Sequence, residues 1–283
     1  MDNTQGASRR LLTVLLAAVL VVTATAAFAQ RIFTGGGGFL RVPPKWGSAE
    51  DFDGSWNYCR GWYASNRAEA GGTGWSTDFP GADNNFSVRL SELTFVRVKL
   101  GLDGQPSNVV LRLSDPLLFR CPVLFMEDTG TIRLRENEIA YLRMYFMKGG
   151  FLWVDDFWGP RAWSQWTEEL ASVMPPKDYP IIDIPKEHPI MHTLYDLKGV
   201  PQVSSIQFWY RNHGSVSERG VDSPHANFKG IEDKNGRLIV VMTHNTDISD
   251  TWEREGENHE YFEKFSPDGY ALGVNIVLYA MTH

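Results

Sequence analysis

The sequence GGFLWVDDFWGP, residues 149–160, gives the strongest indication of the fold. Its glycine pair is typical of the end of a helix, and the apolar run FLWV has the length and composition of a strand buried on both faces. Pro160 favours the first turn of a following helix. The stretch therefore predicts a strand-to-helix turn that carries two adjacent carboxylates, Asp155 and Asp156.

The neighbouring segments extend this pattern in both directions. Residues 135–148 have an apolar stripe at helical spacing, and residues 160–173 have a second one. The apolar runs at 121–127 and 237–244 are typical of further buried strands. Strands that alternate with helices form parallel sheets with right-handed crossovers. We therefore expect an α/β fold with an open, mostly parallel sheet and helices on both faces.

The first 29 residues differ from the rest of the chain. Arg9 and Arg10 precede an uncharged run at 11–22, and an A-x-A site ends at Ala29. This order is typical of a secretory signal peptide that is cleaved after Ala29, although the uncharged run also fits an uncleaved anchor. No second segment is long and apolar enough to span a membrane. We expect export to the periplasm or the cell envelope.

Residues 30–82 are rich in glycine and aromatic residues and lack helical periodicity. We interpret them as an extension that packs on the main α/β domain, residues 83–283. A flexible linker is the alternative, but the density of tryptophan and tyrosine favours packing.

The charge of the chain argues against a nucleic-acid partner. The formal net charge is −7, and removal of residues 1–29, with two arginines and one aspartate, would leave −8. Binding to phosphate backbones requires clustered lysine and arginine, and the sequence contains no such cluster.

The chain contains two cysteines, Cys59 and Cys121. In an oxidising compartment they could form one disulfide. Cys121 begins an apolar run, so a buried free thiol is the alternative, and the sequence slightly favours it.

Four stretches of the sequence resemble a bacterial family, domain of unknown function 4159. They are residues 75–94, 134–159, 187–197 and 244–283. The resemblance implies a flavodoxin-like fold similar to that of class I glutamine amidotransferases, and a setting in the cell envelope. Those amidotransferases keep a nucleophilic cysteine at a strand-to-helix turn. The corresponding turn here, VDDFWG, has no cysteine, so we do not expect glutamine hydrolysis.

Polar residues follow three of the predicted strands. Because ligands of open α/β sheets bind beyond the carboxyl ends of the strands, we expect a pocket there. Side chains alternate along a strand, so Asp155 and Asp156 should point to different sides, and we expect Asp156 to face the pocket. The candidate pocket residues are Glu127, Asp155, Asp156, Trp158, His192, His244 and Asn245.

His188 and His192 have the four-residue spacing of a zinc-binding helix, but no glutamate lies between them. Together with Asp156 they form one candidate metal set. Two histidines that hold a loop by hydrogen bonds are the favoured alternative. No cofactor is evident beyond this candidate divalent metal.

Two further groups contain carboxylates. Asp247, Asp250 and Glu253 could supply oxygen ligands to a hard cation, but we interpret Asp247 and Glu253 as part of a solvated loop. Trp75, Asp78 and Asn85 fit a sugar-binding cleft and a packed loop equally well.

The VDDFWG turn lacks a cysteine nucleophile, and this favours a binding function over a catalytic one. We expect a non-catalytic binding or assembly module with an envelope protein or glycan as its partner. The alternative is a hydrolase, metal-assisted in one version, that acts on an envelope glycan or peptide.

Overall fold

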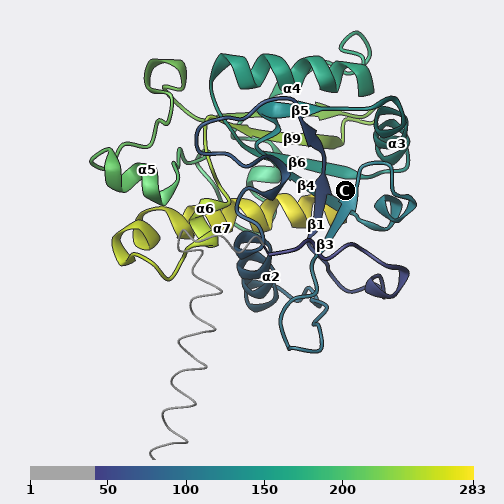
Figure 1. Cartoon of the computed structure of the whole chain (residues 1–283), viewed down its shortest axis with the longest axis horizontal. Helices are drawn as coiled ribbons and strands as arrows, with labels where there is room; N and C mark the ends of the chain where they lie inside the picture. The colour runs from purple at the N-terminus through teal and green to yellow at the C-terminus, as the bar shows by residue number, and fades with distance from the viewer. Residues whose placement is uncertain (1–41) are drawn as a thin grey trace, which may run out of the picture. The chain divides into compact units, whose positions relative to one another are not determined.

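The computed structural model describes residues 42–283, in which seven strands form one sheet in the order β3-β1-β4-β6-β9-β8-β7 (Figure 1). The strands are β1 (Cys59–Trp62), β3 (Val109–Arg112), β4 (Val123–Glu127), β6 (Phe151–Phe157), β7 (Ile182–Asp183), β8 (Asn227–Glu232) and β9 (Leu238–His244). The strands from β3 to β9 in this order run parallel, whereas β8 and β7 are each antiparallel to the strand before them. The predicted α/β fold with a mostly parallel sheet is confirmed.

A separate two-stranded ladder pairs β2 (Ala64–Ser65) with β5 (Ile132–Arg133). The predicted signal peptide, residues 1–29, and residues 30–41 of the predicted extension lie outside the described residues.

Helices cover both faces of the large sheet. The longer ones are α2 (Gly81–Leu93), α3 (Glu136–Met147), α4 (Gly159–Val173) and α7 (His259–Thr282). Figure 1 shows α3 and α4 on one side of the sheet and α2 and α7 on the other. The core divides in the same way, because Met126 of β4 packs with Trp166 of α4, whereas Phe125 packs with Phe86 of α2.

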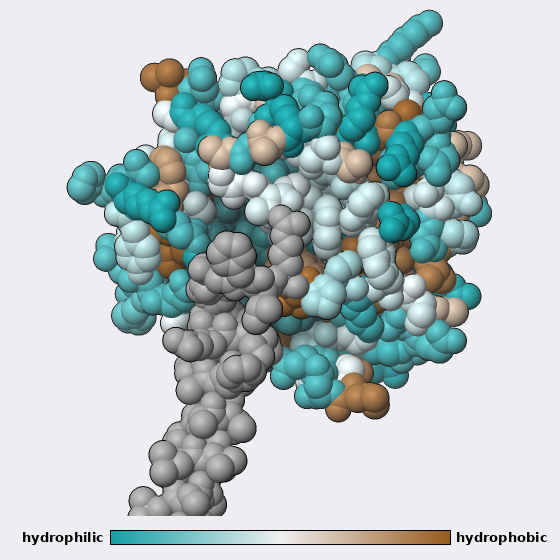
Figure 2. Space-filling view, viewed as in Figure 1, coloured by the Kyte–Doolittle hydropathy of each residue, from teal (hydrophilic) through white to brown (hydrophobic). Residues whose placement is uncertain are grey.

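Short helices complete the structure. They are α5 (Ile206–Arg211), α6 (Asp250–Glu253) and the 3-10 turns η1 (Ala49–Asp51), η2 (Gly74–Ser76), η3 (Pro116–Arg120), η4 (Thr129–Thr131), η5 (Pro189–Met191) and η6 (Gly220–Asp222). No helix among residues 42–283 is long and apolar enough to cross a membrane. The face in Figure 2 is mostly hydrophilic or intermediate, with hydrophobic residues in separate patches.

Part of the predicted extension belongs to the sheet itself. β1, which lies within residues 30–82, pairs with β3 on one side and with β4 on the other. The extension therefore supplies an internal strand rather than packing only against a finished domain. The sequence of β1, CRGW, does not indicate an internal strand, because it contains a charged residue, Arg60. In the structure Arg60 is completely buried.

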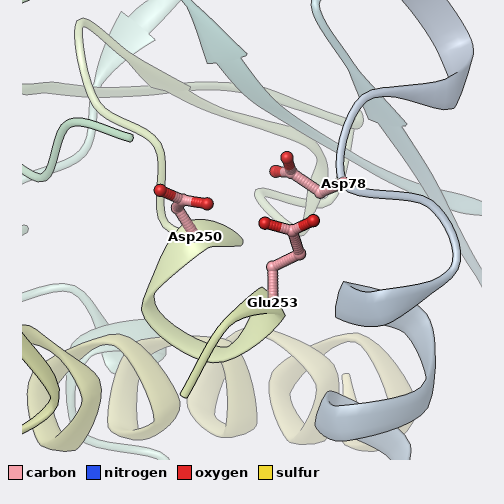
Figure 3. A group of neighbouring side chains, drawn as sticks. All are labelled: Asp78, Asp250 and Glu253. Carbon is pink, nitrogen blue, oxygen red and sulfur yellow. The ribbon is translucent and has the colours of Figure 1, made fainter. Parts of the chain in front are cut away.

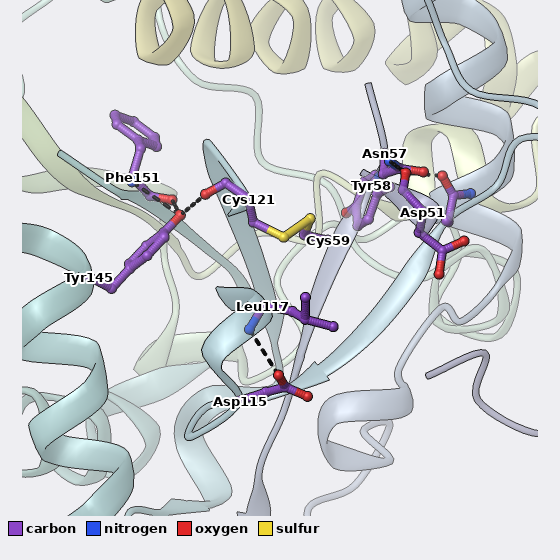
Figure 4. The surroundings of a disulfide bond; sticks show 10 residues. Asp51, Asn57, Tyr58, Cys59, Asp115, Leu117, Cys121, Tyr145 and Phe151 are labelled. Carbon is purple, nitrogen blue, oxygen red and sulfur yellow. Dashed lines mark hydrogen bonds between the residues drawn. A yellow bond between two sulfur atoms is a disulfide. The ribbon is translucent and has the colours of Figure 1, made fainter. Parts of the chain in front are cut away.

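Cys59 and Cys121 form a disulfide with an S–S distance of 2.01 Å (Figure 4). The bond joins the first residue of β1 to the segment just before β4, its neighbour in the sheet. The backbone oxygen of Cys121 also accepts a hydrogen bond from the Tyr145 hydroxyl at 2.9 Å. The favoured interpretation of Cys121 as a free buried thiol was wrong. The apolar surroundings suggested a thiol, but they accommodate a disulfide equally well.

The disulfide should contribute substantially to stability. It closes a loop with a sequence separation of 62 residues. Loop-closure entropy predicts that replacing both cysteines, Cys59→Ser with Cys121→Ser, lowers the free energy of unfolding by about 4 kcal/mol. Urea unfolding of the two proteins measures this difference. Reduction of the wild type should reproduce the loss, and equal stability of the oxidised wild type and the double variant would contradict the prediction.

Candidate functional site

Three neighbouring strands, β4, β6 and β9, carry polar pairs at their carboxyl ends. The pairs are Glu127-Asp128, Asp155-Asp156 and His244-Asn245. One residue of each pair has a left-handed backbone, with φ of 49° at Asp128, 50° at Asp156 and 62° at Asn245. Aspartate and asparagine adopt this conformation more readily than other non-glycine residues. The chain therefore turns sharply at the edge of the sheet where ligands of this fold class bind.

A bulge in β6 lies between Val154 and Phe157, the interval that contains Asp155 and Asp156. Val154 lies opposite Met242 of β9, whereas Phe157, three residues later, lies opposite His244, only two residues further along β9. The extra residue in β6 bends the strand and redirects its side chains. The two adjacent carboxylates consequently have different surroundings.

Asp155 points into the protein. It accepts hydrogen bonds from the Thr243 hydroxyl and, at 2.9 Å, from the backbone N–H of Ser249. Burial raises the pKa of Asp155 to about 7. This residue holds the segment after β9 against β6.

Glu127 lies in a buried ion pair rather than in a pocket. Arg60 donates to its Oε2 atom at 2.6 Å, and the Ser249 hydroxyl donates to its Oε1 atom at 2.7 Å. Arg60 also binds Asp83 of α2, and neither of their side chains is exposed. Glu127 is therefore a structural residue that connects β4 to the segment after β9.

Asp156 points into a cavity of about 600 Å³ beyond the strand ends. Its Oδ1 atom accepts a hydrogen bond from the Trp158 indole at 2.8 Å. Six carboxylate residues line this cavity, and we call them the acidic cluster: Asp78, Asp156, Glu218, Asp247, Asp250 and Glu253. Arg211 and Arg219 line it as well. Trp158 itself lines a smaller recess of about 300 Å³ with Arg67, Arg161 and Arg219.

Five members of the acidic cluster form two groups with the geometry of cation ligands. Asp78, Asp156 and Asp247 form one, and Asp78, Asp250 and Glu253 form the other. Within each group, one ligand oxygen from every residue lies within 4.8 Å of the others. Figure 3 shows the second group, with the carboxylates of Asp250 and Glu253 on α6 facing Asp78 on the segment before α2.

Asp78 is the member that both groups share. It has a left-handed backbone with φ of 59°. Its Oδ2 atom is buried and has no hydrogen-bond partner in the described part of the chain. A buried polar atom without a partner costs about 1–3 kcal/mol. Among the described atoms of this kind, the Asp78 oxygen belongs to a residue that lines the cavity beside other carboxylates.

The segment before Asp78 is held by Asp128. The Asp128 carboxylate accepts a hydrogen bond from the backbone N–H of Gly74 at 2.7 Å. A Cβ atom at Gly72 would collide with the same carboxylate, so only glycine fits there. On the opposite wall, a Cβ atom at Gly269 of α7 would collide with Thr251 of α6. Both walls of the acidic cluster therefore rest on close glycine contacts.

Asp247 and Asp250 also position the wall formed by α6. The backbone N–H of Asp250 donates to Asp247 Oδ1 at 2.9 Å, and the backbone N–H of Ile206 donates to Asp250 Oδ2. Asp247 is only 3% exposed and Asp250 only 2%. The interpretation as part of a solvated loop was wrong for Asp247, which is buried, whereas Glu253 lies on α6 with a side chain that is 20% exposed.

The environment of the acidic cluster disfavours ionised carboxyl groups. Burial raises the pKa values of Asp78, Asp156, Asp247 and Asp250 well above the usual range, and neighbouring carboxylates raise them further. Burial also raises the pKa of Glu253. A bound cation would remove this repulsion, so the cluster is suited to a positively charged ligand.

The structure does not group His188 and His192 with Asp156. His192 is half-exposed, and its ring contacts the Asp196 carboxylate at 2.6 Å and the backbone oxygen of Lys186 at 2.7 Å. His188 accepts a hydrogen bond from the backbone N–H of Ile190 at 3.2 Å. Among the described residues, the groups with cation-ligand geometry contain carboxylates alone. Each histidine thus stabilises a loop, and the sequence-based metal set with Asp156 was wrong.

His244 and Asn245 lie beside the cavity without lining it. Asn245 accepts a hydrogen bond from the backbone N–H of Gly159 at 2.8 Å, at the start of α4. The His244 ring donates to the backbone oxygen of Gly159 at 3.1 Å and packs against Phe157 and Trp163. Burial lowers the pKa of His244 to about 4. These two residues orient the strand-to-helix turn that presents Asp156.

Asn85 and Trp75 belong to a packed loop rather than to a sugar cleft. Asn85 donates to the backbone oxygens of Trp252 and Glu253 at 2.7 and 3.1 Å, and it therefore ties α2 to α6. Trp75 packs against Phe79. Of this predicted group, only Asp78 reaches the cavity.

His244 should make stability depend on pH. Its folded-state pKa of about 4 lies below the unfolded value of 6.5, so the unfolded chain takes up the proton first as the pH falls. The free energy of unfolding of the wild type should fall relative to that of a His244→Gln variant between pH 6.5 and 4. The shift corresponds to a difference of up to about 3 kcal/mol. Urea unfolding across this range measures it, and a difference that does not change with pH would refute it.

Comparison with known families places the chain in one of them. The family described as "Domain of unknown function (DUF4159)" matches residues 66–281, a range that contains every carboxylate of the acidic cluster. A comparison with curated proteins gave no match. Because the match spans most of the 283 residues, the chain belongs to the DUF4159 family.

Proposed function

We propose that this protein is exported to the cell envelope and binds a divalent cation in the acidic cluster. The observation that carries the proposal is the Asp78 carboxylate, whose buried Oδ2 atom has no partner within residues 42–283 and faces other carboxylates. A cation would give that oxygen a partner and compensate the surrounding negative charge.

The ligand atoms favour a hard cation. Every ligand atom in the two groups is a carboxylate oxygen, and Ca²⁺, Mg²⁺ and Mn²⁺ prefer such ligands. Zinc sites, in contrast, usually contain cysteine or histidine. We therefore expect calcium, magnesium or manganese rather than zinc.

Two features support export. Residues 1–29 have the order of a signal peptide, and Cys59 and Cys121 form a disulfide, a bond typical of oxidising compartments. In the envelope, the cation would join the segment before α2 to α6 and so stabilise a module that binds an envelope protein or glycan.

Cation binding can be tested by thermal unfolding and metal analysis. We expect Mn²⁺ or Ca²⁺ at 100 times its dissociation constant to stabilise the metal-free protein by about 2.7 kcal/mol. Asp156→Asn should reduce this effect strongly, because it removes a charged ligand. Asp178→Asn is the matched control, since Asp178 is exposed and lies outside the cluster, and it should respond like the wild type. If the wild type neither retains nor responds to any of the three cations, the proposal fails.

Metal-assisted hydrolysis is a second candidate function. The cavity of about 600 Å³ is much larger than an ion, and Asp156 lies at a strand-to-helix turn with a left-handed backbone. A divalent cation there could lower the pKa of a bound water and so supply a nucleophile. The substrate would be an envelope glycan or peptide that reaches the cation through the cavity.

Incubation of the manganese-loaded protein with cell-wall fragments separates the two functions. Hydrolysis predicts new fragments by mass spectrometry, formed by the wild type and by Asp178→Asn and at least tenfold more slowly by Asp156→Asn. A protein that binds the cation but leaves the fragments intact would be a binding module.

A further inference from the structure

The acidic cluster contains more ligands than one cation needs. Its five cation-ligand residues divide into two groups of three, and only Asp78 belongs to both. Asp156 and Asp247 complete one group, at the end of β6 and just after β9. Asp250 and Glu253 complete the other, on α6.

We propose that the acidic cluster binds two divalent cations with Asp78 as the bridging ligand. This inference rests on the proposed cation site and assigns its stoichiometry. We call the position between Asp78, Asp156 and Asp247 the strand subsite. The position between Asp78, Asp250 and Glu253 is the helix subsite.

The geometry favours two ions over one. Ligand oxygens bound to one hard cation lie about 2.0–2.6 Å from it, and therefore at most about 5 Å from one another. Each group satisfies this limit, with its oxygens within 4.8 Å, but the five residues do not form a single group. One ion could thus use one group fully and would leave the second group without a cation.

The charges of the ligand carboxylates also favour two cations over one. The five cation-ligand carboxylates carry a charge of −5 when ionised, so a single divalent cation would leave −3 on them. Two divalent cations would leave −1, and Arg211 and Arg219 on the cavity wall offset this remaining charge.

Hydrogen bonds orient the ligands of both subsites. Asp156 and Asp247 each accept an N–H group through Oδ1, from Trp158 and from Asp250 respectively, and this leaves Oδ2 for a cation. Asp250 is fixed through its Oδ2 by the backbone N–H of Ile206. Such outer hydrogen bonds are typical of carboxylates that bind metals. Asp78 accepts no hydrogen bond at its buried Oδ2 atom, so this oxygen is available to a cation.

The number of bound ions tests this inference directly. The full chain, stripped with a chelator and reloaded with Mn²⁺, should retain two ions by mass spectrometry of the metal after gel filtration. Asp250→Asn combined with Glu253→Gln should retain one, because only the helix subsite is lost. Asp178→Asn should retain two. One ion in the wild type and in the double variant would overturn the second subsite while leaving the proposed cation site intact, whereas no ion in the wild type would overturn both.

A second measurement takes its main result from the unmodified protein. Two Mn²⁺ ions that share a carboxylate are magnetically coupled, so the electron paramagnetic resonance spectrum of the loaded wild type should differ from the six-line spectrum of isolated Mn²⁺. Asp78→Asn should lose the coupling. A spectrum of isolated ions alone, at two ions per chain, would overturn the bridging role of Asp78.

Discussion

The buried ion pair network of Arg60 determines the position of most other parts of the site. Arg60 on β1 binds Asp83 of α2 and Glu127 of β4, and its guanidinium also donates to the backbone oxygen of Thr77 at 2.9 Å. Burial alone would lower the pKa of Arg60, but the two carboxylates raise it well above its usual value. Charges buried in this way are stable only when their partners are fixed. The network therefore links the segment that carries Asp78 to the central strands.

The same network extends to the opposite wall of the cavity. Glu127 accepts the Ser249 hydroxyl, and Asp155 accepts the Ser249 backbone N–H. Ser249 immediately precedes α6, which carries Asp250 and Glu253. One arginine thus holds both walls at a separation that brings carboxylates together. The repulsion between these carboxylates is offset by the interactions of a rigid framework, which is how proteins maintain a strained binding site.

The sequence predicted the sheet better than it predicted the site. Apolar runs and glycine pairs report local structure directly, so β4, β6, β9, α3 and α4 could be recognised. β1 could not, because a buried arginine satisfied by distant carboxylates has no local signal. For the site, strand alternation suggested that Asp155 and Asp156 face different surroundings, but the bulge that redirects them depends on pairing with β9.

The remaining site residues depended on tertiary contacts. The three-residue spacing of Asp247, Asp250 and Glu253 was visible, yet the burial of Asp250 depends on contacts with Ile206 and with Tyr261 of α7. Asp78 is brought to the cluster from a distant part of the chain, and nothing in its own neighbourhood marks it as a ligand. The four-residue spacing of His188 and His192, in contrast, suggested a metal site, but in the structure each histidine stabilises a loop.

The glycine contacts at Gly72 and Gly269 limit how this cavity could be redesigned. Because a hydrogen atom is all that fits at either position, neither wall can be moved outward by adding a side chain behind it without displacing Asp128 or Thr251. A larger guest molecule would have to be accommodated on the side lined by Arg211 and Asn212, where the side chains are exposed. Changes intended to alter ligand selectivity should therefore begin on the side of the cavity lined by Arg211 and Asn212. The two walls that depend on Gly72 and Gly269 should stay unchanged.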